Sequence, residues 1–276
     1  MLAGHRGKLS LLVVLAVVAT ATVTHADPHA LPRSIPVYIF AGQSNMAGAA
    51  ASAGDLPELA PELTSPQAHV LFFGPTDDRA SRWVPLSAPT EVSQSIYGPG
   101  FGPELSAAAT LASPDEPIAI VKYAHDGTNL YHDWDPSRPN GLYHAMIART
   151  RSALATLAKQ AHAEPRIAGF FWMQGEGDSY TRSNALAYGA NLTELIAHVR
   201  KDLGVPRLRV VLGRIALISG PYSRIVRDEQ ADVARRDRDT TIVSTDDLEH
   251  DPSSLVHLSS SGEIDLGRRF ARALEP

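Results

Sequence analysis

The sequence of 276 residues contains no cysteine. This absence excludes a disulfide framework, a thiolate metal site, a thiol nucleophile and a lipid-modified cysteine. The fold must therefore be stabilised by an ordinary hydrophobic core. A chain of this length with 44% hydrophobic residues is able to bury one, and its length is at the upper end for a single domain.

The sequence also has fewer basic than acidic residues. Lysine and arginine together number 25, against 30 aspartates and glutamates, which gives a formal net charge of −5. Residues 1–26 hold two of the basic residues and none of the acidic ones, so the remainder has 23 against 30. An acidic chain has no electrostatic reason to bind nucleic acid, and we expect no such partner.

Long hydrophobic runs are scarce, and the most apolar one lies near the N-terminus at residues 9–19, after two basic residues. It is about half as long as the ~20 residues that a membrane span needs. A small-x-small cleavage site ending at Ala26 follows it. We therefore predict a signal peptide over residues 1–26 rather than a stable membrane anchor, and a secreted or periplasmic single domain over residues 27–276.

Short β-rich runs recur along the rest of the chain. They lie at 35–41, 118–124, 167–173, 208–215 and 240–244. Such nearly continuous apolar runs are typical of parallel strands that are covered on both faces, and segments with helical period lie between them, most clearly at 142–162. The alternation predicts an α/β domain with a central parallel sheet of about five strands.

Two further patterns refine this prediction. Residues 54–66 and 75–99 are rich in loop formers and predict a long irregular insertion after the first strand. Ser260 and Glu263 form a candidate capping box for a last helix. His257 is accordingly expected in the loop just before that helix.

Polar residues follow three of these elements. Ser44 comes directly after the first strand, between glycines that permit a sharp turn, and Gln174, Glu176 and Asp178 follow the third strand. Open α/β sheets bind ligands at the carboxyl edge of their strands, where His257 should also lie. Taken singly, Ser44 is also a candidate helix cap and the acids are candidates for a solvated loop. Together they offer a serine and the base that its hydroxyl needs.

Five segments resemble the conserved blocks of SGNH hydrolases of the sialate O-acetylesterase and acetylxylan esterase group, which includes carbohydrate esterase family six. The segments are 42–46 around Ser44, 100–105 around Gly102, 127–130 followed by Trp134, 174–178 around Glu176, and 257–259 followed by Gly262. They occur in the family's order and span essentially the whole chain after the predicted signal peptide.

The resemblance implies a three-layer α/β/α, flavodoxin-like fold. It also implies a serine esterase that removes O-acetyl groups from a carbohydrate through an acyl-enzyme on Ser44, with His257 as base. The implied oxyanion donors are the Ser44 amide, the Gly102 amide and the Gln174 side chain. The implied substrate-binding residues are Gln43, Asn45, Gly127, Thr128 and Trp134. The acetylated glycan and the oligomeric state stay open.

The acid partner of His257 is where this sequence departs from its relatives. Many of them carry an aspartate two or three residues before the histidine, whereas here Leu255 and Ser254 stand there. Some members of the group use the glutamate that matches Glu176, so we predict a Ser44, His257 and Glu176 triad, with Asp251 or Asp247 as alternatives. An acid in this role fixes the imidazole tautomer and stabilises the imidazolium.

No metal or cofactor is expected. The pairs His125-Asp126 and His132-Asp133 lack the histidine spacing of known zinc motifs and are better explained as solvated loop residues. Two other functions remain open. One is an SGNH hydrolase that cleaves lipids or thioesters, and the other is an inactive carbohydrate-binding relative.

Overall fold

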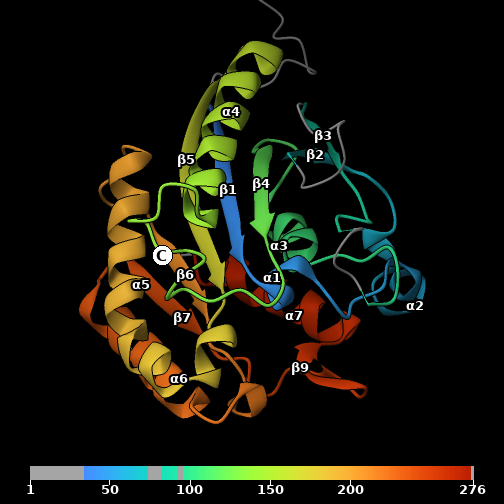
Figure 1. Cartoon of the computed structure of the whole chain (residues 1–276). Helices are drawn as coiled ribbons and strands as arrows, with labels where there is room; N and C mark the ends of the chain where they lie inside the picture. Colours follow the sequence, from blue (N-terminus) through green and yellow to red (C-terminus); the bar gives the residue numbers. More distant parts are fainter. Residues whose placement is uncertain (1–33, 74–81, 92–95, 275–276) are drawn as a thin grey trace, which may run out of the picture. The chain divides into compact units, whose positions relative to one another are not determined.

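The computed structural model describes residues 34–73, 82–91 and 96–274. Within these residues the main sheet has seven strands in the order β3-β2-β4-β1-β5-β6-β7 (Figure 1). The strands are β1 (Ser34–Gly42), β2 (Gln67–Phe73), β3 (Val84–Leu86), β4 (Ile118–Ala124), β5 (Glu164–Met173), β6 (Val210–Gly213) and β7 (Thr240–Val243). Neighbouring strands are parallel except β2 and β3. The predicted parallel sheet is confirmed, with two strands more than expected.

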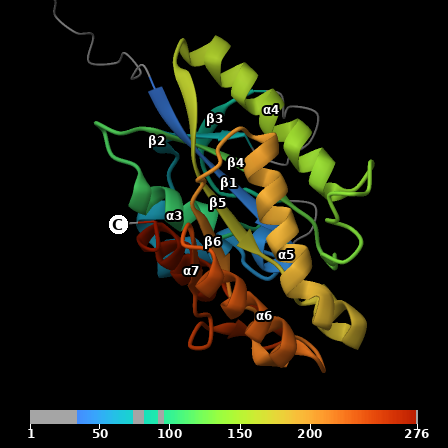
Figure 2. The same ribbon diagram turned by 90° about the vertical axis from the view of Figure 1, so that its left-hand side faces the viewer.

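Helices cover both faces of this sheet (Figure 2). One side carries α4 (Leu142–Ala161), α5 (Arg182–Asp202) and α6 (Ser223–Arg236), and the other carries α3 (Glu104–Leu111) and α7 (Ser260–Arg272). The shorter helices are α1 (Ser44–Ala47) and α2 (Leu56–Leu59). The predicted three-layer α/β/α arrangement is confirmed. None of the described helices combines the length and apolar character needed to cross a membrane.

The central strand β1 shows why both faces are covered. Its residues Ile39 and Ala41 belong to the apolar cluster on the side of α4 and α5, whereas Phe40 belongs to the cluster with α3 and α7. Successive side chains of a strand point to opposite faces, so an apolar run must be buried from both sides. This pattern makes β1 the middle of the molecule's core.

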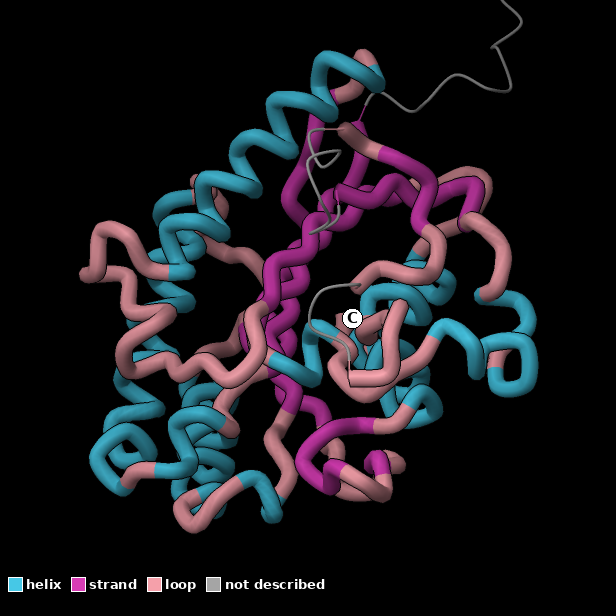
Figure 3. Tube along the Cα trace, turned by 45° about the vertical axis from the view of Figure 1, so that its right-hand side comes forward, coloured by secondary structure: helices cyan, strands magenta, loops and turns pink. Residues whose placement is uncertain are grey.

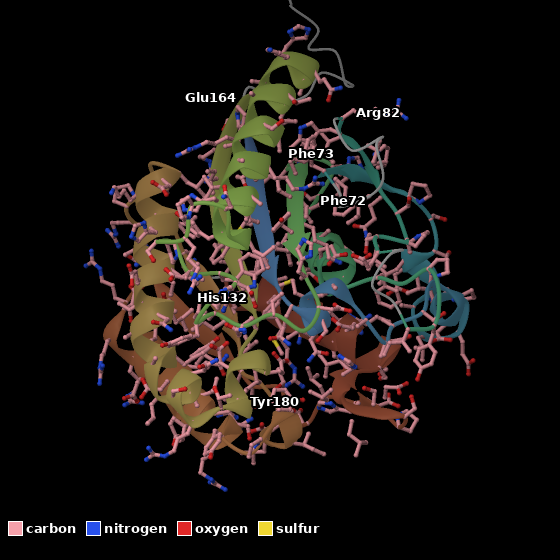
Figure 4. All side chains as sticks on the ribbon, viewed as in Figure 1. Phe72, Phe73, Arg82, His132, Glu164 and Tyr180 are labelled. Atoms are coloured by element: carbon pink, nitrogen blue, oxygen red, sulfur yellow. The ribbon has the colours of Figure 1, made fainter. Side chains whose placement is uncertain are left out.

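The strand order places a topological switch point beside β1. The order β4-β1-β5-β6-β7 is that of flavodoxin-like sheets, in which the chain moves outward first to one side of the first strand and then to the other. The reversal lies between β1 and β5, where open sheets bind their ligands. Figure 4 locates this end of the sheet: Glu164 begins β5, and Tyr180 lies beyond the strand's carboxyl end.

The predicted insertion after β1 is more regular than expected. It contains β2, β3 and α2, together with the 3₁₀ turns η1 (Ala53–Asp55) and η2 (Pro61–Leu63). The strand β2 lies between the two segments that are rich in loop formers, and its carboxyl half is apolar and mostly buried. This half pairs with β4 and widens the parallel sheet. Residues 74–81 and 92–95 of the insertion, like the predicted signal peptide, lie outside the described residues.

A separate hairpin precedes the last helix. It consists of β8 (His250–Asp251) and β9 (Ser254–Leu258) and lies apart from the main sheet (Figure 3). His257 is therefore in a strand, and its predicted place in a loop is wrong. The capping box is also wrong, because Ser259 caps α7 by accepting a hydrogen bond from the Gly262 amide at 3.2 Å.

Candidate active site

Ser44 lies at a turn that is locked by backbone contacts. We call residues 42–48, which contain the predicted nucleophile Ser44, the nucleophile turn. A Cβ atom at Gly42, where φ is 150°, would lie 1.9 Å from the Met173 carbonyl oxygen of β5. At Gly48, where φ is 89°, it would lie 1.9 Å from the Phe101 carbonyl oxygen. Gly42 thus allows the close approach to β5 just before α1 starts at Ser44, and Gly48 ends α1 in the left-handed conformation.

Asn45 connects this turn to His257. The Asn45 Nδ2 atom donates to the Val256 carbonyl oxygen at 3.1 Å, and the Leu258 amide donates to Asn45 Oδ1 at 2.9 Å. The residue that follows Ser44 therefore holds the backbone on both sides of His257. We call this pair of contacts the Asn45 clamp, and the β8–β9 segment the histidine hairpin.

The Ser44 hydroxyl and the His257 ring are brought to one edge without a hydrogen bond between them in the described part of the chain. Ser44 Oγ has no hydrogen-bond partner among the described residues, although Ser44 is only 4% exposed. Catalytic hydrogen bonds are often long before substrate binds, so this geometry is compatible with a serine and its base.

The His257 ring is held by a serine. Its Nδ1 atom lies 2.7 Å from Ser254 Oγ. Burial lowers the pKa of His257 below its ordinary 6.5, and the nearby Asp251 carboxylate partly opposes this effect. The imidazole is therefore neutral at neutral pH, which is the form that accepts a proton.

Glu176 does not make the predicted contact with His257. Its Oε1 atom accepts a hydrogen bond from Asn45 Nδ2 at 2.8 Å, and the side chain is buried. The physical reason is that Asn45 lies between the carboxylate and the histidine hairpin and bonds to both. Burial raises the pKa of Glu176 to about 7, partly opposed by hydrogen bonds that favour the carboxylate.

The two alternative acids also have other partners. Asp251 Oδ1 accepts hydrogen bonds from the Tyr97 hydroxyl at 2.8 Å and from the Ser253 amide at 2.9 Å. Asp247 forms two contacts of 2.7 Å with the Arg269 guanidinium, which lowers the pKa of this carboxyl to about 2. Neither carboxylate hydrogen-bonds the His257 ring within the described residues.

Two of the three predicted oxyanion donors point into the protein. The Gly102 amide faces Glu104 Oε1 at 3.3 Å. The Gln174 Nε2 atom is within hydrogen-bond distance of three internal acceptors: Gln43 Oε1 at 3.1 Å, the Thr128 carbonyl oxygen at 3.1 Å and Asp178 Oδ2 at 2.8 Å. Of the predicted set, the Ser44 amide remains, since no hydrogen bond engages it within the described residues.

The predicted substrate-binding residues mostly serve the fold. Trp134 is 0% exposed, its ring meets the Trp172 ring edge-on, and its Nε1 atom donates to Thr128 Oγ1 at 3.0 Å. The Trp134 side chain is therefore part of the core, and its contact with substrate stays a prediction. Gln43 Oε1 accepts from the Gly177 amide at 3.2 Å and so braces the loop after β5. Gly127, with φ of 66°, permits the turn that precedes Thr128.

A buried ion pair behind the nucleophile turn was not predicted. Lys122 Nζ lies 2.7 Å from Glu104 Oε1, and both side chains are fully buried. Lys122 Nζ also donates to the Ala47 carbonyl oxygen at 2.9 Å, which ties the end of α1 to the Gly102 segment. The sequence did contain a signal, because a lysine inside the apolar run 118–124 requires a buried partner.

Among the described residues, no group of three or more histidine, cysteine, aspartate or glutamate side chains is arranged to hold a metal ion. His132 and Asp133 instead contact each other at 3.0 Å on the surface.

The sequence model of the family "Carbohydrate esterase, sialic acid-specific acetylesterase" matches residues 34–275, which is most of the chain. The chain belongs to this family. Carbohydrate esterases are carboxylic ester hydrolases, so the predicted family and enzyme class are both confirmed.

Individual relatives agree with this assignment. The esterase is 26% identical over 255 residues to a probable carbohydrate esterase of Arabidopsis thaliana, with 86% of this chain and 89% of that protein covered. A solved structure of an Arabidopsis thaliana protein superposes with a TM-score of 0.71 at 24% identity, covering 88% and 98% of the two chains. A carbohydrate acetylesterase from Xanthomonas citri gives 0.62 at 19% identity, covering 86% and 55%. These two likenesses show the fold alone.

Proposed function

We propose that the protein is a secreted serine esterase that removes O-acetyl groups from a carbohydrate through an acyl-enzyme on Ser44. The observation that carries this proposal is the Asn45 clamp. It fastens the segment of His257 to the residue next to Ser44, at the switch point of the sheet of a carbohydrate esterase. Secretion rests on the signal-peptide pattern of residues 1–26.

In the proposed reaction, neutral His257 takes the proton of the Ser44 hydroxyl as Ser44 Oγ attacks the acetyl carbonyl carbon. The tetrahedral oxyanion accepts a hydrogen bond from the Ser44 amide. The C–O bond to the sugar then breaks, and His257 returns its proton to the departing sugar oxygen. Water, deprotonated by the same histidine, hydrolyses the acetyl-enzyme and releases acetate.

Glu176 takes part in this mechanism through Asn45. Its Oε1 atom accepts from the same Nδ2 atom that donates to the hairpin backbone, so the carboxylate orients the amide of the clamp. We retain Glu176 as part of the site in this supporting position, one residue removed from the base.

The proposal is tested by measuring acetate release from acetylated xylan, O-acetylated sialic acid and acetylated peptidoglycan. The wild-type protein should release acetate from at least one of them, and Ser44→Ala should lose turnover by about 10⁴-fold or more while its circular dichroism spectrum stays unchanged. Full activity in folded Ser44→Ala would overturn the mechanism.

Acyl chain length distinguishes this function from a lipase-like one. Aryl acetate should be hydrolysed far faster than aryl octanoate, because the sugar esters in question carry a two-carbon acyl group. A preference for octanoate would favour the lipid-cleaving alternative. Binding of a glycan without any ester hydrolysis would favour the inactive relative.

A further inference from the structure

The group on the His257 Nδ1 atom is a hydroxyl where serine esterases commonly have a carboxylate. We propose that Ser254 is the positioning residue that fixes the tautomer and orientation of His257 in this esterase. The proposal rests on the proposed function for its kinetic part. It assigns to Ser254 the orienting role that the sequence had predicted for Glu176.

The geometry of the histidine hairpin supports this role. Pro252 and Ser253 form the turn between β8 and β9, so Asp251 and Ser254 flank it. Asp251 accepts hydrogen bonds from the backbone amides of Ser253 and Ser254 and from the Ser253 hydroxyl, the last at 2.6 Å. The carboxylate thereby fixes the backbone of Ser254. With the backbone fixed, Ser254 Oγ reaches the ring three residues later.

The hydrogen bond determines which ring nitrogen acts as base. If Nδ1–H donates to Ser254 Oγ, the lone pair on Nε2 is free to accept the proton of Ser44 Oγ. No proton passes to Ser254 at any step. A neutral hydroxyl stabilises the imidazolium less than a carboxylate does, because hydrogen bonds to charged acceptors are about twice as strong. Ser254 therefore orients the base, and the more distant Asp251 charge supplies part of the missing stabilisation.

The two supports of His257 act on different atoms. The Asn45 clamp, backed by Glu176, holds the main chain on either side of the histidine, whereas Ser254 holds the ring itself. Rotation of the ring about its own side-chain bonds is restrained by Ser254 alone among these contacts. Removal of the Ser254 hydroxyl should consequently affect the base without loosening the hairpin.

Kinetics on an aryl acetate give the first test. Ser254→Ala should lower kcat by about 10- to 100-fold and change KM by less than about twofold, because the ring does not bind the substrate in the ground state. Ser254→Thr keeps the hydroxyl and should restore most of the activity. Ser253→Ala is the matched control, since that hydroxyl lies in the same turn and bonds to Asp251 but not to the ring.

A carboxylate at position 254 gives a second readout. The titratable groups that act on His257 are Asp251 and His250 of β8, while Glu176 bonds to Asn45, which holds the backbone on both sides of the histidine. Ser254→Asp adds a negative charge closer than any of these. It should move the acidic limb of kcat/KM to higher pH by about one unit, since an adjacent anion raises the pKa of an imidazole.

Nitrogen NMR of ring-labelled histidine shows which nitrogen of the His257 ring carries the proton, and it does so independently of activity. His257 should give the Nδ1–H tautomer in the wild-type protein and a mixture in Ser254→Ala, with the signal assigned by its loss in His257→Gln. If the wild-type protein cleaves no ester, the proposed function fails while this spectrum still tests Ser254. The inference is overturned by an Nε2–H tautomer, or by Ser254→Ala activity within about twofold of wild type.

Discussion

The nucleophile turn and the histidine hairpin meet at one site but are held in place by different kinds of interaction. The turn is fixed by close backbone approach at Gly42, against β5 of the main sheet, and at Gly48, against Phe101 in the segment before α3. The hairpin belongs to no part of that sheet and is joined to the turn by the two hydrogen bonds of the Asn45 clamp. The position of Ser44 thus follows from the fold, whereas the position of His257 depends on a few side chains.

Asn45 is the residue that joins the two regions, so Asn45→Ala should have the largest effect on both activity and stability. It removes the clamp and leaves the buried Glu176 and Leu258 and the half-buried Val256 without these hydrogen bonds. We expect kcat to fall by on the order of 10²- to 10³-fold and the free energy of unfolding to fall by about 2–4 kcal/mol. Steady-state kinetics and urea unfolding measure the two effects.

Asn140→Ala provides the matched control, because that asparagine is exposed. It should change neither quantity appreciably. If Asn45→Ala stays within about threefold of wild-type activity, the hairpin is held by something other than the clamp, and the contrast between the two regions disappears.

Glu176→Gln should separate stability from catalysis. Burial holds the pKa of Glu176 near 7 in the folded protein, above its ordinary 4.5, so ionisation destabilises the fold as the pH rises from 4.5 to 7. The variant cannot ionise, and should therefore exceed the wild type in unfolding free energy at pH 8 by on the order of 3 kcal/mol, with little difference at pH 4. Urea unfolding at the two pH values checks this.

The same variant keeps a side-chain oxygen that can accept the Asn45 hydrogen bond, and its kcat should remain within about tenfold of wild type. A direct acid partner of His257 would instead lose about 10²- to 10⁴-fold on this change. Such a loss, in a folded protein, would restore the sequence-based assignment of Glu176.

The pH profile of the wild-type enzyme reports on the hairpin. Because burial lowers the pKa of His257, kcat/KM for an aryl acetate should be constant near neutral pH and decrease only below pH 6.5, where the base becomes protonated. A limb near pH 7 would point to Glu176, whose pKa is raised to about that value, as the group that controls turnover.

Tyr97→Phe should have the smallest effect. It removes one hydrogen bond to Asp251 from a side chain that is 46% exposed. We expect about 1 kcal/mol of lost stability or less, and a change in kcat below about threefold, because the backbone amides still hold Asp251. Thermal unfolding with parallel kinetics would show this. A loss comparable to that of Asn45→Ala would make Asp251, rather than the clamp, the main support of the hairpin.

The parts of the site that follow from strand ends were predictable from the sequence. Two apolar runs that become neighbouring parallel strands must deliver the residues after them, Ser44 and Glu176, to the same edge. The partner of each side chain was not predictable in the same way. Whether Glu176 reaches His257 or stops at Asn45 depends on a few ångströms, and no periodicity encodes such a distance.

Trp134 shows that the sequence pattern also does not predict whether an aromatic side chain in a loop is buried. An aromatic side chain among polar loop residues has the same sequence pattern whether it stacks on a sugar or packs inward. Here its indole N–H finds Thr128 Oγ1, and its ring packs against Tyr123 and Trp172. A tryptophan can be buried in a polar loop only when its N–H finds a hydrogen-bond acceptor. Whether an acceptor lies within reach depends on the three-dimensional fold.

The Asn45 clamp recognises main-chain atoms, the carbonyl of Val256 and the amide of Leu258. Because these atoms belong to the main chain, the clamp does not depend on which side chains stand at positions 256 and 258, provided that those side chains still pack. A hairpin of another length would meet the same two main-chain atoms, but it would serve the site only if its tip also presented a group to the His257 ring, as Ser254 does. The main-chain contacts thus set where the hairpin docks, whereas the side chains of its tip set how the His257 ring is oriented.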